Sequence, residues 1–255
     1  MIYRIVGTST FLVGSIHLVP KGVALSLDLQ RKLVEQSQEV VFESDLDHVA
    51  PPPERHLQSG HLSDLLSKEV YEKVVSLSTQ VAFPESVDLI KPWFVGMVLS
   101  VRLQISSGAV PGGVDRVLWD YARSLGKPMF VLEGYEVFQK IDEAPVAESV
   151  AALEYLASYP EQPVHQLSRI YEAWEKSDSL ALDSAFTTMA RLAPTIYRYL
   201  FDERNRLWMP SILKAIRENR RAVFVVGCGH IAHGAESIQI QLKNAGFSLE
   251  AVHEA

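Results

Sequence analysis

The chain has 255 residues, of which 47% are hydrophobic and 22% are charged, so it is long and apolar enough to bury a large core. Its 24 Lys and Arg residues against 31 Asp and Glu residues give a formal charge of −7, which argues against binding nucleic acid through bulk charge. The single cysteine, Cys228, excludes an intramolecular disulfide and any multi-cysteine zinc or iron–sulfur site.

The N-terminal part alternates between strand and helix patterns. Residues 2–6 and 10–16 are rich in β-branched and aromatic side chains, which predicts a hairpin or two adjacent strands. Leucines repeat every four residues over 25–33, so a helix follows, and 39–43 returns to strand character. Residues 45–53 end in three prolines and are therefore predicted to form a loop.

The middle of the chain is mostly helical. Residues 62–106 follow a helical pattern, and the Gly- and Pro-rich residues 107–113 interrupt it. Residues 114–125 carry one apolar helical face, and 129–132 have the composition of a buried strand. Residues from about 135 to 219 are predicted to be helical again.

The C-terminal part returns to strand and helix. Residues 222–226 form the strongest strand pattern, followed by a helical stripe over 235–245 and a last strand at 247–252. Strands that alternate with helices predict an α/β fold. We therefore expect a single domain over residues 1–255. Its central mixed β-sheet is formed by the N- and C-terminal parts and flanked by helices, with a helix-rich middle insertion.

The N-terminus does not have the pattern of a secretory signal, because Arg4 interrupts its short apolar run. The longest uncharged, mostly apolar run, 92–101, is about half the length that a membrane-spanning helix needs. The sequence predicts a cytoplasmic protein without a membrane span, although a chain trimmed of its leader would have the same pattern.

Two copies of Gly-x-x-His are the first candidate site. One ends in His17 and the other in His230, and each follows a predicted strand and precedes a helix and a further strand. Ligands bind at the carboxyl ends of strands in α/β sheets, so the two imidazoles are expected to face one cleft. Imidazole is both a common metal ligand and a common general base. The alternative is a pair of unrelated structural histidines.

Acidic residues supply further candidates. Glu43 ends a buried strand pattern and would lie near His17, where two histidines and a carboxylate suit a catalytic divalent ion with an open water position. The alternative is an exposed carboxylate at the end of a strand. Asp115, at the start of a helix, and Glu133, at the end of a strand, are candidates to orient a ligand. Asp115 also suits helix capping.

Arg204 lies on an apolar helical stripe, between Glu203 and Asn205. A guanidinium in that position either meets an acidic partner or ligand, or extends to the helix surface as an ion pair. We expect Arg204 to point into the same cleft and to contact Glu43, Asp115 or another carboxylate.

Other signals have less support. The stretch 227–232 imitates a dinucleotide-binding fingerprint, but too little chain follows it for the expected βαβ halves. His48, His56 and His61 form a loop cluster whose spacing matches no metal motif. No Gly-x-Ser-x-Gly or His-Glu-x-x-His pattern occurs. Cys228 lies between two glycines and is expected to be a small packed residue.

Read together, these segments resemble the TraB/GumN family, which includes Tiki-type membrane proteases and bacterial pheromone-shutdown proteins. The matching segments occur in the family's order and span nearly the whole chain: 13–20, 42–45, 113–115, 127–133, 203–205 and 226–230. The resemblance implies a fold related to erythromycin esterases and haem-binding ChaN-like proteins. One departure is that His233 and Glu236 stand where the family usually has small residues, and they either add to the pocket rim or take no part in it.

The resemblance also implies a site made of His17, His230, Glu43 and the Arg204-Asn205 pair. Tiki-type members are described as divalent-metal-dependent proteases, so Mn²⁺ or Co²⁺ is the favoured ion, with Zn²⁺ as the alternative. Substrates do not transfer from the bacterial members.

The leading hypothesis is therefore a metal-dependent hydrolase of peptide bonds. His17, His230 and Glu43 would hold the ion or act on its bound water. Arg204 and Asn205 would donate hydrogen bonds to the oxyanion or to the substrate. Asp115, Glu133 and Glu203 would orient these groups; together the set is His17, Glu43, Asp115, Glu133, Glu203, Arg204, Asn205 and His230.

Two alternatives stay open. One is a non-catalytic protein that binds a peptide or haem in the same cleft. The other is a metal-independent esterase that acts on a small-molecule substrate and uses His17 or His230 as general base together with Glu43.

Overall fold

The computed structural model describes residues 1–48, 54–134 and 137–252. Its centre is a six-stranded sheet in the order β6-β4-β7-β2-β1-β8. The strands are Ile2–Ile5 (β1), Phe11–Ser15 (β2), Glu39–Phe42 (β4), Met129–Val131 (β6), Ala222–Gly227 (β7) and Leu249–Ala251 (β8). Strands β6, β4, β7 and β2 are parallel, and β1 is antiparallel to both of its neighbours. The predicted α/β fold with a mixed central sheet is confirmed.

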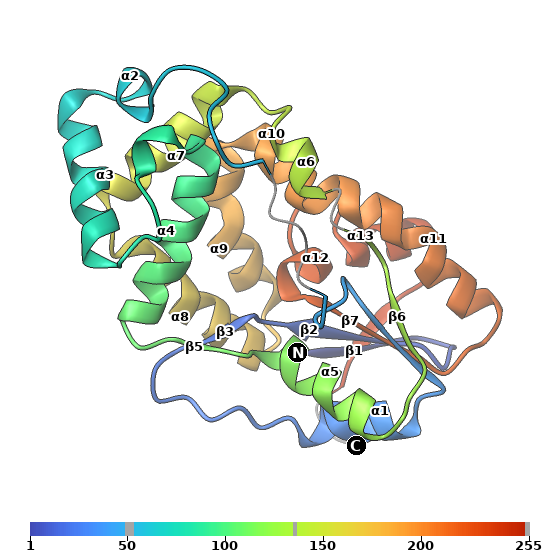
Figure 1. The fold of residues 1–255 in the computed structure, drawn as a ribbon. Coiled ribbons are helices and arrows are strands. Elements are labelled where there is room, and N and C mark those ends of the chain that lie inside the picture. Colours follow the sequence, from blue (N-terminus) through green and yellow to red (C-terminus); the bar gives the residue numbers. More distant parts are fainter. Residues whose placement is uncertain (49–53, 135–136, 253–255) are drawn as a thin grey trace.

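The two ends of the chain meet in the middle of this sheet. Strand β2 pairs with β7, and Ser15 lies opposite Gly227, so the blue and red strands in Figure 1 run side by side. Strand β7 is buried along nearly its whole length because its Ala-Val-Phe-Val-Val run has no polar face to expose. This pairing brings the segments after both strands to one edge of the sheet.

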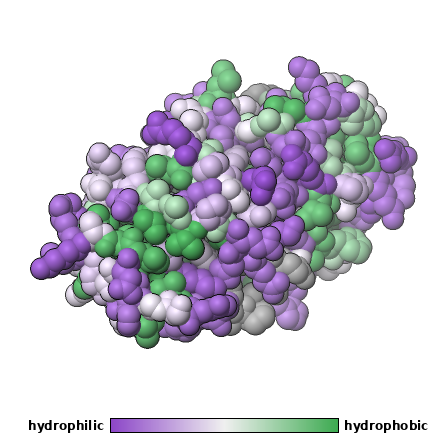
Figure 2. All heavy atoms as spheres, turned by 90° about the horizontal axis from the view of Figure 1, so that it is seen from above, coloured by the Kyte–Doolittle hydropathy of each residue, from purple (hydrophilic) through white to green (hydrophobic). Residues whose placement is uncertain are grey.

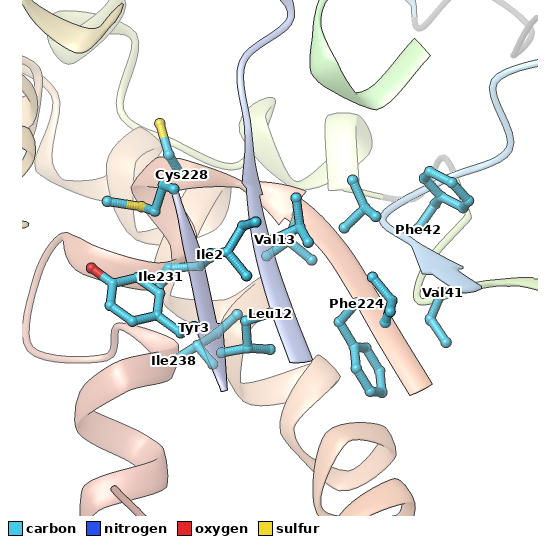
Figure 3. Packing of buried hydrophobic residues seen from close by; sticks show 14 of the residues in the cluster. Ile2, Tyr3, Leu12, Val13, Val41, Phe42, Phe224, Cys228, Ile231 and Ile238 are labelled. Atoms are coloured by element: carbon cyan, nitrogen blue, oxygen red, sulfur yellow. The ribbon is translucent and has the colours of Figure 1, made fainter. Parts of the chain in front are cut away.

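Helices cover both faces of the sheet. Helices α1 (Asp28–Gln36) and α5 (Val114–Ser124) lie on one face, whereas α11 (Glu203–Arg217), α12 (Cys228–Ala232) and α13 (Ile238–Asn244) lie on the other (Figure 1). In Figure 3, strand residues such as Leu12, Val13 and Phe224 pack in one cluster with Ile231 and Ile238 from the covering helices. The apolar faces of these helices therefore pack against the two apolar faces of the sheet.

A second group of helices lies beyond the sheet, at the left of Figure 1. It has its own buried core, formed mainly by α3 (Lys68–Gln80), α4 (Pro92–Ser106) and α7 (Val146–Ser158). The remaining helices are α2 (Leu62–Leu65), α6 (Val137–Ile141), α8 (Gln162–Glu175), α9 (Ser179–Leu192) and α10 (Pro194–Tyr197). A 3-10 turn lies at Val87–Leu89 and a π-helical turn at Arg198–Asp202. The predicted helical character of 62–106 and 137–219 is confirmed; residues 135–136 lie outside the described residues.

Four features differ from the expectations. Strand β6 is not a buried strand, because it lies at the edge of the sheet with Phe130 52% and Val131 45% exposed. The last helix begins at Ile238 rather than near residue 235, because Gly234 has a positive φ of 80° and Ser237 caps the helix by accepting from the Ile240 amide. The short helix α12 follows β7 directly. A separate two-stranded sheet joins Leu18–Val19 (β3) to Val110–Pro111 (β5).

Two other expectations concern loops and membranes. Residues 45–48 form no helix or strand, as expected, and 49–53 of the same predicted loop lie outside the described residues. None of the helices in the described parts of the chain is both long enough and apolar enough to cross a membrane.

Gly113 holds the end of β2 against the start of α5. Its amide donates to the carbonyl of His17 at 3.0 Å, and the amide of Val114 donates to the carbonyl of Ile16 at 2.9 Å. A Cβ atom on Gly113 would lie 1.8 Å from the Ile16 oxygen, so only glycine allows this approach. The contact fixes Asp115 beside the segment that carries His17.

We predict that Gly113→Ala destabilises the protein by roughly 1–3 kcal/mol, because backbone must move to accept the methyl group. The melting temperature should fall by roughly 2–10 °C. Gly96→Ala is the matched control, since a Cβ there meets nothing within 4 Å and the residue lies inside α4. An unchanged melting temperature for Gly113→Ala would contradict this close approach.

Candidate functional site

The candidate site lies where the four parallel strands end. His17 follows β2, Glu43 follows β4, Glu133 follows β6 and His230 follows β7 within α12. Parallel strands end at the same edge of a sheet, so this topology brings together residues that are far apart in the sequence.

Arg204, in the first turn of α11, links these strand ends. Its Nε donates to both carboxylate oxygens of Glu133 at 2.9 Å, and its Nη2 donates to Glu133 at 2.6 Å and to Glu43 at 2.8 Å. Its Nη1 donates to the carbonyl of Leu200 and to Nε2 of His230, both at 3.0 Å. The expected contact between Arg204 and carboxylates is therefore confirmed, and all five N–H groups of the guanidinium have partners.

The aromatic ring of Trp208 completes the surroundings of Arg204. The guanidinium carbon lies 4.8 Å from the ring centroid, and the indole N–H donates to Glu133 at 3.0 Å. Burial raises the pKa of the Glu133 carboxyl, against the opposing effect of Arg204. Glu133 thus orients Arg204, the kind of role expected from its position.

Glu43 is held as a carboxylate. One oxygen accepts the amide hydrogen of Gly227 and the other accepts from Arg204. Burial opposes its ionisation, but the His230 ring, Arg204, His17 and the Gly227 amide together lower the pKa of Glu43 to about 2. Gly227 is suited to this position because a Cβ there would lie 3.2 Å from the carboxylate oxygen.

His230 is buried and neutral. Its Nδ1 lies 2.8 Å from Oδ1 of Asn205, an acceptor, so Nδ1 carries the proton and Nε2 accepts from Arg204. Burial, followed by the charge of Arg204, lowers the pKa of His230 to about 3. The rings of Trp208 and Phe201, with centroids 4.4 and 4.9 Å away, hold the imidazole in place.

His17 has the opposite properties. Its side chain is 68% exposed, and its Nδ1 lies 2.7 Å from Oδ2 of Asp115. Partial loss of hydration around the ring opposes protonation, but the hydrogen bond and the charge of Asp115, with help from Glu43, raise the pKa of His17 to about 9. The described residues give Nε2 of His17 no hydrogen-bond partner. His17 is therefore charged at neutral pH, with one ring nitrogen available to a ligand.

The two Gly-x-x-His motifs are thus alike in sequence but not in structure. After β2 the chain bends at His17 before β3 begins, and the side chain of His17 is exposed. After β7 the chain turns at once into α12, so His230 is buried. Both imidazoles influence the pKa of Glu43, which lies between the two units in the sequence. The His230 ring lies 3.9 Å from Glu43, whereas His17 acts on Glu43 only through its charge, so the shared cleft of the two histidines stays a prediction.

Three expected roles need correction. The amide nitrogen of Asn205, a fully buried residue, already donates to the carbonyls of His230 and Glu236, so it has no donor left for an oxyanion. Asn205 orients His230 instead. Glu203 pairs with Lys140 at 3.0 Å and with Arg198 at 3.6 Å, and so faces away from the site because it lies one residue from Arg204 on the helix. Arg204 was also expected to donate to an oxyanion or substrate, but its N–H groups are all hydrogen-bonded within the protein.

Other residues from the sequence analysis lie outside this site. His233 is buried, with Nδ1 2.5 Å from Asp183, and Glu236 pairs with Arg206. Cys228 is a buried, packed thiol, as expected, and burial raises its pKa to about 12. The loop histidines pair with nearby acids rather than with one another: His48 with Asp45, His56 with Glu85 and His61 with Asp88.

The donor groups do not form a metal site in this arrangement. Within the described residues, no set of three His, Cys, Asp or Glu side chains is placed to hold an ion. Both ring nitrogens of His230 are hydrogen-bonded, and both oxygens of Glu43 accept hydrogen bonds, one from Arg204 and the other from the Gly227 amide. An ion bound by His17, Glu43 and His230 therefore requires Arg204 to leave.

Sequence reasoning missed three partners. The Leu200 carbonyl and the Gly227 amide are backbone groups, which no sequence motif identifies. Trp208 lies four residues after Arg204, and this spacing on one helical face was an available signal.

Glu43 gives a pH-dependent prediction. Its pKa is lower in the folded protein than the ordinary value of 4.5, so its ionised form stabilises the fold above pH 4.5, and this stabilisation is lost as the pH falls towards 2. We expect Glu43→Gln to lower the free energy of unfolding most at pH 7, with the difference from the native protein shrinking between pH 4.5 and 2. Urea unfolding at several pH values measures this difference.

Glu203→Gln is the matched control, because its ion pairs are partly exposed and contribute about 1 kcal/mol or less. A destabilisation by Glu43→Gln that stays constant from pH 7 to pH 2 would contradict the ionised state of Glu43.

Comparison with known proteins supports the family resemblance. The model of the TraB/PrgY/gumN family matches residues 2–251, which is nearly the whole chain. No curated protein and no solved structure matches the chain, so the likeness to ChaN-type folds is not established. With the family model covering every strand of the central sheet, the chain belongs to the TraB/PrgY/gumN family.

Proposed function

We propose that the protein is a hydrolase of acyl bonds, peptide bonds in particular, in which His17 donates a proton and Glu43 accepts one. The observation that carries this proposal is the His17–Asp115 pair at the same sheet edge as an ionised Glu43. Pairs of titratable groups whose surroundings drive their pKa values apart identify the acid and the base of a site. Here the pKa of His17 is about 9 and that of Glu43 is about 2.

In the proposed step, Glu43 takes a proton from a water molecule as the water oxygen attacks the acyl carbon. His17 gives its Nε2 proton to the leaving atom as the acyl bond breaks. The products are a carboxylic acid and an amine or alcohol, and the proton on Glu43 then returns to His17 through solvent. Asp115 orients the imidazole and stabilises its charged form, as a carboxylate does beside a catalytic histidine.

The charged state of His17 supports a peptide rather than an ester substrate. An amine leaves only when its nitrogen is protonated, whereas an alcohol depends less on a general acid. A histidine that stays protonated at neutral pH supplies this proton directly.

A metal-dependent peptidase using Mn²⁺, Co²⁺ or Zn²⁺ is the second candidate. The hydrogen bonds at Nδ1 of His17 and His230 are of the kind that orient metal-binding histidines. The position of Arg204 argues against it, and no step of our proposal uses an ion.

Cleavage of a peptide library tests the proposal. We expect His17→Gln and Glu43→Gln each to lower kcat about 10²–10⁴-fold, the usual contribution of a general acid or base. His48→Gln, in an exposed loop pair, is the control and should keep native activity. Absence of any cleavage by the native protein would favour the binding-protein alternative, and full activity of either variant would remove that residue from the mechanism.

The pH profile separates the two candidates. In our proposal His17 must be protonated, so activity should fall as the pH rises through about 9. Asp115→Asn removes the charge that raises the pKa of His17, so the alkaline fall should move roughly 1–3 pH units lower. An alkaline limb at the same pH in both proteins would contradict the role of Asp115.

A chelator completes the comparison. We expect kcat to be unchanged after treatment with a chelator and after addition of Mn²⁺. Activity that is lost to the chelator, restored by one ion and still rising through pH 9 would establish the metal-dependent candidate instead.

A further inference from the structure

A cavity separates the helices at the end of the molecule away from the sheet. Its volume is about 330 Å³, and it lies between α4, α7, α8, α9 and α10. Its lining is mostly aliphatic and aromatic, with Leu153, Leu156 and Ile196 among the buried residues. It adjoins the candidate site through Leu200, which lines the cavity and whose carbonyl accepts from Arg204.

Two polar side chains of the wall are already hydrogen-bonded within the wall. The side-chain amide of Gln104 donates to the Pro163 carbonyl at 2.9 Å, and that of Gln166 donates to the Ala185 carbonyl at 3.0 Å. These bonds join neighbouring helices and keep the cavity shape. An apolar occupant therefore leaves neither of these amide groups without a partner.

The cavity opens to the surface among apolar side chains. Met97, Val101 and Met189 line it and are each about two-fifths exposed, and Figure 2 shows apolar residues gathered over the helical end of the molecule. Arg169, also exposed, is the one charged residue of the lining among the described residues. Its guanidinium contacts the Ser184 hydroxyl at 3.3 Å, and no carboxylate of the described residues lies within ion-pair distance.

We propose that this cavity binds a single-chain amphiphile with an anionic head, namely a long-chain carboxylate. The aliphatic chain would fill the apolar interior, and the carboxylate would pair with Arg169 at the opening. A cavity of ~150 Å³ accepts benzene, so this one has room for roughly ten to twelve chain carbons. The inference does not depend on the proposed hydrolysis.

Gly96 offers a direct probe of the cavity. It lies inside α4 and lines the cavity, and a Cβ atom there would meet nothing within 4 Å. A large side chain at this position is therefore expected to enter the cavity without displacing the backbone. Gly96→Ala is the matched control, because it adds only one methyl group and favours the helix by about 0.5–1 kcal/mol.

Calorimetric titration with octanoate, decanoate and dodecanoate, below their micelle-forming concentrations, tests the proposal. We expect each added methylene to tighten binding to the native protein about fourfold until the cavity is full. Gly96→Leu should weaken dodecanoate binding at least about tenfold, whereas Gly96→Ala should stay within about fourfold of native affinity. Ala152→Phe, which fills the cavity from α7, should repeat the loss if the leucine variant does not fold.

The head group is tested separately. Dodecanol should bind the native protein about fivefold more weakly than dodecanoate, and Arg169→Gln should abolish this difference. Equal binding of the alcohol and the carboxylate would overturn the anionic head. Absence of saturable dodecanoate binding, or equal binding to the leucine and alanine variants of Gly96, would overturn the cavity as the binding site.

Discussion

Arg204 places a positive charge in a largely buried position, where removal from water costs several kcal/mol unless every donor finds a partner. The structure meets this requirement with Glu133, Glu43, His230 and the Leu200 carbonyl, so that one guanidinium joins helix α11 to the ends of β4 and β6 and to helix α12. The same charge is among the causes that keep Glu43 ionised. Burial keeps His230 neutral, and the charge of Arg204 adds to this effect because a second cation beside it would be repelled. One side chain thus contributes to the ionisation states of two neighbours.

His17 lies beyond the reach of Arg204's hydrogen bonds and is controlled by Asp115 instead. Two identical four-residue patterns therefore give one buried neutral imidazole and one exposed charged imidazole. This division suits general acid–base chemistry, in which different groups hold and accept the proton. It also leaves His230 without a free ring nitrogen for an ion while Arg204 stays in place.

Much of the fold was predictable because the strands of the central sheet are short, apolar and bounded by turn residues. The convergence of His17, Glu43 and Glu133 followed from a single rule, that parallel strands end at one edge. The environment of each side chain was not predictable. Asn205 and Glu203 flank Arg204 in the sequence, yet the rotation of a helix by 100° per residue directs one to His230 and the other to Lys140. Helix α12, which buries His230, was missed because its five residues are too few for a periodic pattern.

The protonation states of the two imidazoles test the central claim most directly, and nitrogen-detected NMR of the histidine rings measures them. We predict that at pH 7 both ring nitrogens of His17 carry protons and that this ring titrates near pH 9. His230 should carry a proton on Nδ1 alone and should not titrate until the pH falls towards 3. Titration of both rings near the ordinary value of 6.5 would contradict the account, because neither Arg204 nor Asp115 would then control its histidine.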